Sequence, residues 1–571
     1  METFKEYFSE KNLLLAYERY KRSKKSVKDI FGFKAFTNNL EDNLKNLSDK
    51  LLNGNYKPSL SKKFYMPKSS LTQRTQTILC IEDALVFQAI GNKIGQITYD
   101  ELSKNYSIYV FGSLLNEEVK YGEDIYNKIE DPQFFFYQYW PPLYSKFSEL
   151  IYNAIIKDKV LYKFETDITG FFDCIPHFNL LSILDVNFNI PTEILDLLSL
   201  CLNRWSGTRD NLTPGVGIPQ GPETSYLLAN IMLHDLDNQF IDQGIKYFRY
   251  MDDIHIFGYE KKLLQKYLVN IDTFLKSNGL SINAKKTKIE NVIHDESEPS
   301  LIRFLQVSSE DDDFIDSIIF TPKPIIPQFD SEQDAREDSN YQKPRFLTSE
   351  EIIKYYLEEI QQITCILPNF FEISDQNEII VKYEIIDNPN SNIKREKERE
   401  ILNIAYRYRT AFYELTFYLD ITPNKDLIKY WLCLLKTYYW RANNFCWVLN
   451  LYKGEESLKG LLFELINEFE IYEWIRYNII STLTITQKFN KEELQKIFRE
   501  LLLKETSPYA REAYYKLLLY HCDKDDQFFK SIIHKINGEH NIPLRNELLF
   551  YSLIKKQDLF TIDEIMESFR I

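Results

Sequence analysis

The sequence predicts an α+β fold in which a mixed region with an antiparallel sheet is followed by an all-α region. Strand-forming aromatic and β-branched residues flank a tight turn at residues 250–253, which predicts a β-hairpin over residues 246–257. A second apolar strand pattern covers residues 163–167. Beyond residue 348, apolar residues recur at three- and four-residue spacing, which predicts helices almost to the last residue.

Three acidic residues are the candidates for catalysis. Asp167 ends the first strand pattern, and Asp252 and Asp253 stand together in the turn of the hairpin. Phosphoryl transfer assisted by two divalent cations needs carboxylates that hold the ions roughly 3.5–4 Å apart. We expect Asp167 and Asp252 to form that pair and Asp253 to be a nearby outer ligand.

A glycine-rich loop lies between these strands. Residues 215–225 contain three glycines, and residues 226–233 continue with helical apolar spacing. Glycines permit close approach of the backbone to a ligand, and the N-terminus of a helix carries a partial positive charge. The loop is therefore a candidate site for a template base or a nucleotide.

The order and spacing of these motifs resemble the palm of reverse transcriptases. Together with the fingers, the resemblance covers roughly residues 50–307. In the palm it rests on Asp167 to Asp173, Pro219-Gln220-Gly221 with Ser225 and Asn230, Tyr250-Met251-Asp252-Asp253, Leu280 to Asn283 with Lys285, Lys286 and Thr287, and Phe304-Leu305. The fingers resemblance rests on Asn53 to Pro58, Pro67-Lys68, Arg74, Glu82-Asp83 and Val110 to Ser113.

The resemblance implies a right-hand polymerase with fingers and an antiparallel palm sheet. It implies two Mg²⁺ ions, or Mn²⁺ as a substitute, held by Asp167, Ile168, Asp252 and Asp253. It implies a nucleotide site in which Lys68 and Arg74 grip the triphosphate, Phe172 is the steric gate that selects deoxynucleotides, Gln220 and Gly221 form the pocket floor, and Lys285 lies near the primer and triphosphate. Asp173 has the plainer interpretation of a turn or cap residue.

Several features depart from the family pattern. Pro222 stands where many relatives have glycine, Tyr226 where they have proline, and Gln306 where they have glycine. An aromatic insertion at residues 132–142 is interpreted as a packed lobe or subunit contact, with base stacking as the alternative. The basic run at residues 21–25 is either a solvated helix end or a phosphate contact.

Composition limits the partners. The formal net charge of −15 argues against a surface coated for nucleic acid, although residues 1–100 hold 17 lysines and arginines against 11 acidic residues. The seven cysteines lack paired spacing, so zinc and a disulfide framework are not expected. We find no leader pattern and no long apolar stretch, and expect a bacterial cytoplasmic protein with no membrane association.

The expected domain organisation has three parts. Residues 1–320 form the fingers and palm with an insertion at about residues 114–158, residues 321–347 form a linker rich in Pro, Asp, Ser and Glu, and residues 348–571 form a HEAT-like helical repeat domain in place of the thumb. The expected helices include residues 401–419, 427–449, 458–483 and 492–503.

This layout resembles the abortive-infection class of antiphage reverse transcriptases, close to the wider unknown-group defence enzymes. The class implies a homo-oligomer, a phage trigger, and template-independent synthesis of single-stranded DNA from dNTPs, attached to a protein hydroxyl. Tyr7 is the first candidate primer, with Tyr17 and Tyr20 behind it. The alternatives are a retron-like enzyme that copies a dedicated non-coding RNA, and a non-catalytic interaction scaffold.

Overall fold

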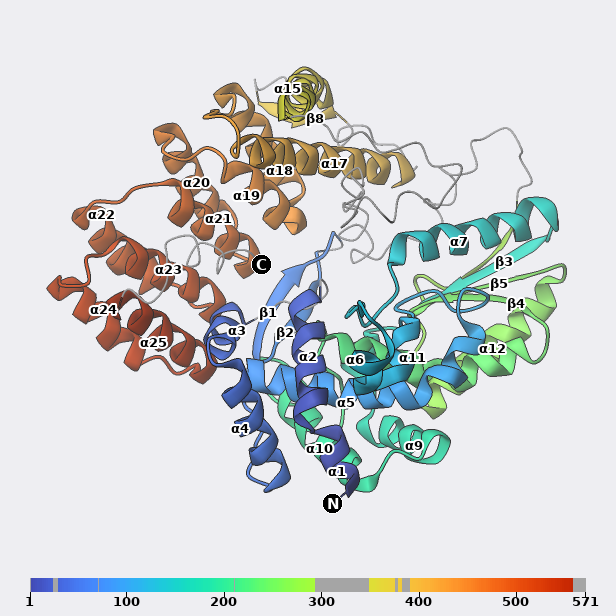
Figure 1. Cartoon of the computed structure of the whole chain (residues 1–571). Helices are drawn as coiled ribbons and strands as arrows, with labels where there is room; N and C mark the ends of the chain where they lie inside the picture. Colours follow the sequence, from blue (N-terminus) through green and yellow to red (C-terminus); the bar gives the residue numbers. More distant parts are fainter. Residues whose placement is uncertain are drawn as a thin grey trace.

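The computed structural model describes residues 2–23, 29–69, 71–209, 211–292, 349–374, 378–382 and 391–557. Within them, a mixed region at residues 2–292 lies beside a mostly helical region at residues 349–557, with the hairpin of strands β1 and β2 between the two (Figure 1). The predicted linker at 321–347 and the predicted motif Phe304-Leu305 with Gln306 lie outside the described residues.

The first part of the chain is helical around one two-stranded sheet. Strands β1 (Lys62–Pro67) and β2 (Gln73–Ile78) form an antiparallel hairpin that pairs Lys63 with Thr77. Helix α5 (Ile81–Leu102) follows directly and is buried over most of its length. The preceding helices are α1 (Glu2–Tyr7), α2 (Glu10–Arg22), α3 (Ile30–Thr37) and α4 (Leu40–Leu52).

The predicted antiparallel sheet is present, with four described strands in the order β4-β5-β3-β6. These strands are β3 (Tyr162–Thr166), β4 (Lys246–Tyr250), β5 (Asp253–Gly258) and β6 (Lys288–Asn291). The helices of this region are α8 (Phe171–Cys174), α9 (His177–Phe188), α10 (Thr192–Trp205), α11 (Glu223–Ile241) and α12 (Lys261–Ser277).

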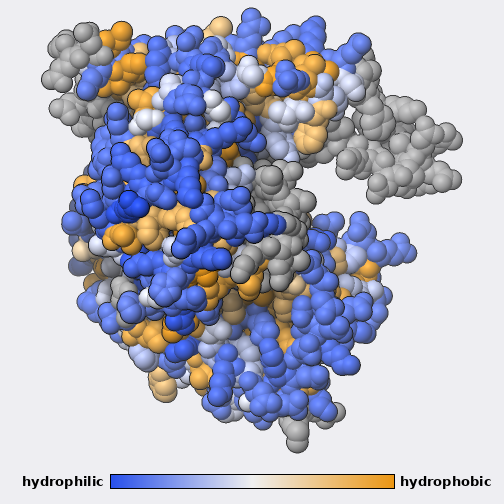
Figure 2. All heavy atoms as spheres, turned by 90° about the vertical axis from the view of Figure 1, so that its left-hand side faces the viewer, coloured by the Kyte–Doolittle hydropathy of each residue, from blue (hydrophilic) through white to orange (hydrophobic). Residues whose placement is uncertain are grey.

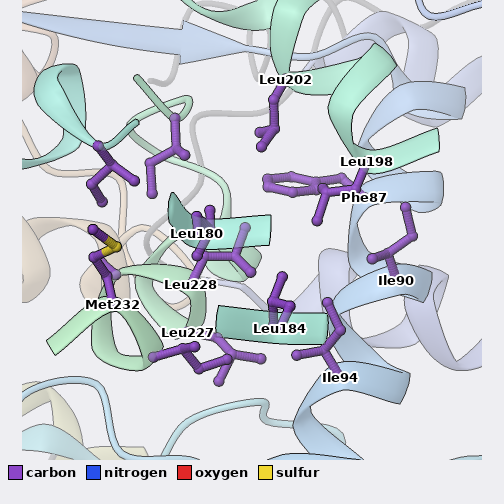
Figure 3. Packing of buried hydrophobic residues seen from close by; sticks show 14 of the residues in the cluster. Phe87, Ile90, Ile94, Leu180, Leu184, Leu198, Leu202, Leu227, Leu228 and Met232 are labelled. Atoms are coloured by element: carbon purple, nitrogen blue, oxygen red, sulfur yellow. The ribbon is translucent and has the colours of Figure 1, made fainter. Parts of the chain in front are cut away.

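A hydrophobic core joins α5 to the helices α9, α10 and α11. Leu and Ile side chains with helical spacing on α5, α9, α10 and α11 point toward one another around Phe87 (Figure 3). The residues labelled there, all buried, are Phe87, Ile90, Ile94, Leu180, Leu184, Leu198, Leu202, Leu227, Leu228 and Met232. Because burial of apolar surface dominates folding free energy, this core fixes α11 and the loop that precedes it.

The aromatic insertion is partly packed. Its last three residues begin helix α7 (Trp140–Tyr152), which continues into the π-helical turn η3 (Asn153–Lys157). Upstream lie the 3-10 helices η1 (Ser103–Asn105) and η2 (Glu117–Asp124) and helix α6 (Ile125–Lys128). Phe136 and Tyr137 are buried, whereas Phe135 and Tyr139 are 43% and 49% exposed. Burial of the first two rings favours the packed interpretation.

The C-terminal region is a two-layer stack of helices in which α15, α17, α19, α21, α23 and α25 pack successively side by side. Its helices are α15 (Ser349–Ile366), η4 (Leu367–Phe370), α17 (Ser391–Leu415), η5 (Lys425–Leu427), α18 (Ile428–Thr437), η6 (Tyr439–Arg441), α19 (Ala442–Leu449), α20 (Glu456–Glu468), α21 (Glu473–Thr486), α22 (Lys491–Lys496), η7 (Ile497–Leu502), α23 (Pro508–His521), α24 (Gln527–Asn537) and α25 (Ile542–Gln557). The outer face of the molecule on this side is mostly hydrophilic with scattered apolar side chains (Figure 2).

Two predictions for this region are wrong in detail. It is not all-α, because strands β7 (Phe371–Ile373) and β8 (Ile379–Val381) form a small antiparallel sheet. The helices expected at 427–449 and 458–483 are each broken, because Tyr438 and Phe469 leave helical backbone geometry. No helix in the described ranges is long and apolar enough to cross a bilayer.

Candidate active site

The predicted catalytic hairpin forms as expected. Strands β4 and β5 are antiparallel with Tyr250 opposite Asp253, so Met251 and Asp252 make a two-residue turn. Met251 has φ of +53°, a conformation that costs a non-glycine residue roughly 1–3 kcal/mol and persists only where contacts from the surrounding structure offset that cost. The turn is therefore a strained element that needs support from neighbouring residues.

Arg249 supplies much of that support. Its guanidinium, 1% exposed, donates to the carbonyl of Met251 at 2.7 Å and to Asn230 Oδ1 at 3.0 Å. The same group forks onto Asp237 of α11, with Nε–Oδ1 and Nη2–Oδ2 distances of 2.7 and 2.6 Å. Arg249 thus ties the turn to the buried helix α11.

Close packing from Gly112 also restrains the turn. A Cβ at Gly112 would lie 2.5 Å from the backbone nitrogen of Met251, so no larger residue fits without movement. Asn230 Nδ2 donates to the carbonyls of Gly112 and Ser113 at 3.0 and 3.2 Å. Asn230 therefore binds the segment at Gly112 directly and is linked to the turn through Arg249.

The structure brings Asp167 to the hairpin. Thr166, the last residue of β3, pairs with Ile254 of β5, so Asp167 leaves the sheet beside Asp253. Burial raises the pKa of Asp167, as does the charge of Asp253, while Lys286 opposes the rise. Lys286 Nζ lies 2.8 Å from Asp167 Oδ2. The first and third motifs therefore meet at one edge of the sheet.

Asp167 has a free coordination position. Its Oδ1 atom is buried and lacks a hydrogen-bond partner among the described residues. A buried carboxylate oxygen without a partner is costly, and divalent cations such as Mg²⁺ are bound through carboxylate oxygens. The chemistry of Asp167 and Asp252 fits a divalent cation, although no group of three or more His, Cys, Asp or Glu side chains in the described chain forms a ready-made metal cluster.

Ile168 follows Asp167 in the predicted metal motif. It is buried and pairs with Ile282 in an isolated antiparallel bridge, while the Asn283 amide donates to the Asp167 carbonyl at 2.8 Å. The backbone of the first motif is thus fixed by the segment that precedes Lys286.

His255 holds the second acid of the turn. Its Nε2 lies 3.1 Å from Asp253 Oδ2, and its Nδ1 lies 3.6 Å from Glu165 Oε1. Although burial opposes the charge of His255, Asp253 and Glu165 raise its pKa to about 10. Asp253 is therefore engaged inside the sheet, as an outer ligand would be, while Asp252 occupies the turn.

The charges of three cations on the β1–β2 hairpin act on Asp173. Burial raises the pKa of Asp173, and the charges of Lys63, Lys68 and Arg74 oppose that rise. Burial lowers the pKa of Lys63 to about 8, and its Nζ donates to Thr77 Oγ1 at 3.1 Å. Asp173 lies within α8 rather than capping a helix, so the cap interpretation is corrected.

The glycine-rich loop lies between this hairpin and Phe172. Thr77 donates its amide to the Gln220 carbonyl at 2.9 Å, and Ile218 donates to the Phe172 carbonyl at 2.8 Å. Gly221 has φ of +125°, and a Cβ there would lie 3.2 Å from the Thr77 carbonyl oxygen. The loop thereby links the two elements that carry the predicted nucleotide contacts.

The structure shows where the two departures from the family pattern, Pro222 and Tyr226, lie. Pro222 is the N-cap residue of α11. Tyr226 packs its ring edge-on against Phe172, with centroids 5.2 Å apart, and Ser225 donates to the Pro219 carbonyl at 2.6 Å. Tyr226 thus packs against the side chain of the predicted steric gate, Phe172.

The predicted palm lysines differ in position. Lys285 is exposed, whereas Lys286 reaches Asp167. The three nominated priming tyrosines are all buried, with Tyr7 only 3% exposed. Burial raises the pKa of Tyr7 and of Tyr20, and Tyr17 bonds to Thr37 Oγ1 at 2.9 Å. In this conformation their hydroxyls are not presented to solvent.

Two residues were missed in the sequence. Arg249 could have been found as a charged residue inside the apolar strand pattern 246–250. His255 could have been found because residues i and i+2 share a face of a strand, which places it beside Asp253.

Comparisons with known proteins bear on this arrangement. The family described as "Reverse transcriptase (RNA-dependent DNA polymerase)" matches residues 112–314. No curated protein matches the chain. Residues 112–314 include Asp167, Phe172, the glycine-rich loop and the catalytic hairpin.

Solved telomerase structures are similar to this chain only at low TM-scores. The Candida albicans telomerase in complex with a TWJ fragment of telomeric RNA is 12% identical with a TM-score of 0.34, over 75% of this chain and 66% of that chain. The apo telomerase of Candida tropicalis is 9% identical with a TM-score of 0.30, over 86% and 69%. This chain thus spans less than two thirds of the length of the C. albicans protein. The family match shows that residues 112–314 carry a reverse transcriptase domain, and such a domain indicates a nucleotidyltransferase of the RNA-directed DNA polymerase kind.

Proposed function

We propose that this chain is a DNA polymerase of antiphage defence, of the abortive-infection kind, that makes single-stranded DNA from dNTPs without a template and primes it on its own protein hydroxyl. The observation that carries the polymerase chemistry is Asp167 beside the predicted catalytic turn, with one buried carboxylate oxygen that has no hydrogen-bond partner in the described part of the chain. The defence assignment is supported by the sequence resemblance and by the helical region that follows the palm.

Asp167, the Ile168 carbonyl and Asp252 would hold two Mg²⁺ ions, with Asp253 behind them. Bound there, the ions would activate the attacking oxygen and stabilise the leaving group. Lys286 pairs with Asp167 and keeps that carboxylate at the edge of the sheet. Arg249 and His255 fix the turn and its second acid.

The remaining residues would bind the nucleotide. Lys68 and Arg74 would contact the triphosphate, where arginine offers a bidentate fork. Phe172, backed by Tyr226, would exclude the sugar 2′-hydroxyl, and Gln220 and Gly221 would form the floor. Lys285 would meet the primer or the triphosphate from solvent.

In the priming step a tyrosine oxygen attacks the α-phosphorus of a dNTP, the bond to the β-phosphate breaks, pyrophosphate leaves, and the hydroxyl proton passes to solvent. Tyr7, Tyr17 and Tyr20 remain the nominated primers, and their burial requires that the N-terminal helices move first. We further propose a HEAT-like repeat domain at residues 348–571, a homo-oligomer in the bacterial cytoplasm, and a phage component as trigger.

A second candidate is templated synthesis on a dedicated non-coding RNA. The description of the matched family as RNA-dependent and the glycine-rich loop with Gln220 and Gly221 favour it.

One experiment separates the two. Purified, nuclease-treated protein is incubated with labelled dNTPs and Mg²⁺ with and without added RNA, and the products are run on a denaturing gel before and after protease. Label that stays with the protein until proteolysis supports protein priming. Label that needs RNA and is indifferent to protease contradicts it and supports the second candidate. Asp252→Ala is the matched inactive control.

A further inference from the structure

Strand β1 has two faces with different partners. Lys62, Phe64 and Met66 alternate along the strand, and all three contact the C-terminal helical region. Lys63, between them, points to the opposite face, where it bonds to Thr77 and lies near Asp173. Because successive side chains of a strand point to opposite faces, one strand joins the helical region to the cationic cluster.

The contact of Phe64 is an aromatic stack. Its ring lies 5.5 Å from that of Trp474 on α21 and 4.8 Å from that of Tyr509 on α23, with interplanar angles of 14° and 12°. All three rings are buried. Phe64 is therefore part of the hydrophobic core of the helical region.

Lys62 completes a cluster of four charges in which Glu512 and Lys516 are buried and Lys62 and Glu547 are partly buried. Its Nζ lies 2.5 Å from Glu512 of α23 and 2.6 Å from Glu547 of α25. Lys516 of α23 pairs with the same two carboxylates at 2.7 and 2.9 Å. Without Lys62 the two carboxylates share a single lysine, and the charge of Asp29 also acts on Glu547. Breaking a buried ion pair is strongly destabilising because it leaves an uncompensated charge.

A second polar contact holds the same strand and the loop after α10. Glu473, the first residue of α21, accepts from the backbone amide of Tyr65 at 3.0 Å and from Arg209 Nη1 at 2.7 Å. The Arg209 guanidinium also lies over the Tyr65 ring at 5.0 Å. The end of one helix thereby restrains both β1 and the segment that leads to the glycine-rich loop.

We propose that the C-terminal helical region positions the hairpin that binds the triphosphate, and that Lys62 is a positioning residue for the incoming dNTP. The inference rests on the proposed nucleotidyl transfer at the same site. A movement of α21, α23 or α25 is transmitted through β1 to Lys63, Lys68 and Arg74. The helical region then sets nucleotide affinity from outside the palm.

The test compares Lys62→Met with Lys62→Arg by steady-state incorporation of labelled dNTP. A displacement of about 1 Å in the groups that position a substrate can reduce the catalytic rate by up to about a hundredfold. We expect Lys62→Met to raise KM for dNTP about tenfold with kcat within about twofold of wild type, and Lys62→Arg to restore KM because it keeps the charge. An unchanged KM in Lys62→Met, or no rescue by Lys62→Arg, overturns the inference.

Arg511→Met is the matched control. Arg511 lies on α23 like Glu512, and it forks onto Glu539 with distances of 3.0 and 2.7 Å, so both partners belong to the helical region. We expect KM to stay at the wild-type value in Arg511→Met. A tenfold rise there would mean that general loosening of the helical region, rather than the contact with β1, sets KM, and would also overturn the inference.

Hydrogen exchange keeps this test distinct from that of the proposed function. We expect residues 62–78 to exchange faster in Lys62→Met than in wild type or Arg511→Met, in the absence of any substrate. If wild-type protein incorporates no nucleotide, the proposed function fails, while unchanged exchange in the hairpin separately refutes the coupling through Lys62.

Discussion

Replacement of Arg249 by methionine should destabilise the palm strongly. The substitution leaves Asp237 buried and charged without its partner, and it removes the donors to Asn230 and to the Met251 carbonyl. Breaking a buried ion pair from one side costs about 3–5 kcal/mol. We expect Arg249→Met to lower the free energy of unfolding by that amount, measured by equilibrium urea unfolding followed by tryptophan fluorescence.

A second substitution separates stability from function. Asp237→Asn in the Arg249→Met background removes the uncompensated charge and keeps an acceptor for the Tyr247 hydroxyl, which donates to Asp237 at 2.7 Å. We expect the double variant to regain at least about half of the lost stability. Its rate of dNTP incorporation should stay low, because the strained turn at Met251 remains without its arginine.

Lys246→Met is the control from the same strand. Lys246 pairs with Asp158 at the surface, and exposed pairs contribute about 0–1 kcal/mol. The reasoning is refuted if Arg249→Met costs no more than Lys246→Met, or if the double variant is less stable than Arg249→Met alone.

Three further predictions follow from the site. Phe172→Ala should raise the ratio of ribonucleotide to deoxynucleotide incorporation by roughly one to two orders of magnitude in competition assays; an unchanged ratio contradicts the gate. Burial alone would raise the pKa of Glu547, but Lys516 and Lys62 lower it below its ordinary 4.5. The stability that this ionised carboxylate contributes is therefore complete above pH 4.5 and is lost as the pH falls further. Between about pH 5 and pH 3, the free energy of unfolding measured in urea should fall further in wild type than in Glu547→Gln, and equal decreases contradict this. Gly112→Ala should slow incorporation and cost about 1–3 kcal/mol by its collision with Met251, whereas Gly460→Ala, in open space on α20, should stabilise by about 0.4–1 kcal/mol in the same unfolding assay.

The catalytic hairpin could be predicted because its signals are local. Alternating apolar residues around two acids determine β4, the turn and β5, and the strand that ends at Asp167 has the same kind of pattern. The pairing of β3 with β5 then follows from the need to bury both strands. The hairpin predicted over residues 246–257 forms, with β5 extending to Gly258, and Asp167 lies beside it, while the catalytic roles of the acids stay predictions.

The breaks inside the predicted C-terminal helices could not be predicted. At Tyr438 and Phe469 the chain turns without glycine or proline, and the flanking apolar spacing continues across both positions. Local propensity therefore favours one long helix where tertiary packing imposes two.

The contact between the β1–β2 hairpin and the helical region could not be predicted either. Lys62 meets Glu547 across 485 positions of sequence, and Tyr65 meets Glu473 across 408. A lysine in a strand and a glutamate in a helix are each ordinary surface residues by composition. Only the fold shows that they meet.

The most direct test of the central claim is Mg²⁺-dependent incorporation of labelled dNTP by wild type, Asp167→Asn and Asp252→Asn. Asp42→Asn, which changes an exposed acid on α4, is the control. We expect wild type and Asp42→Asn to incorporate label equally and both active-site variants to be at least about a thousandfold slower, equivalent to about 4 kcal/mol of transition-state stabilisation. Incorporation near the wild-type rate in either Asp167→Asn or Asp252→Asn would contradict the claim that these two carboxylates carry the reaction.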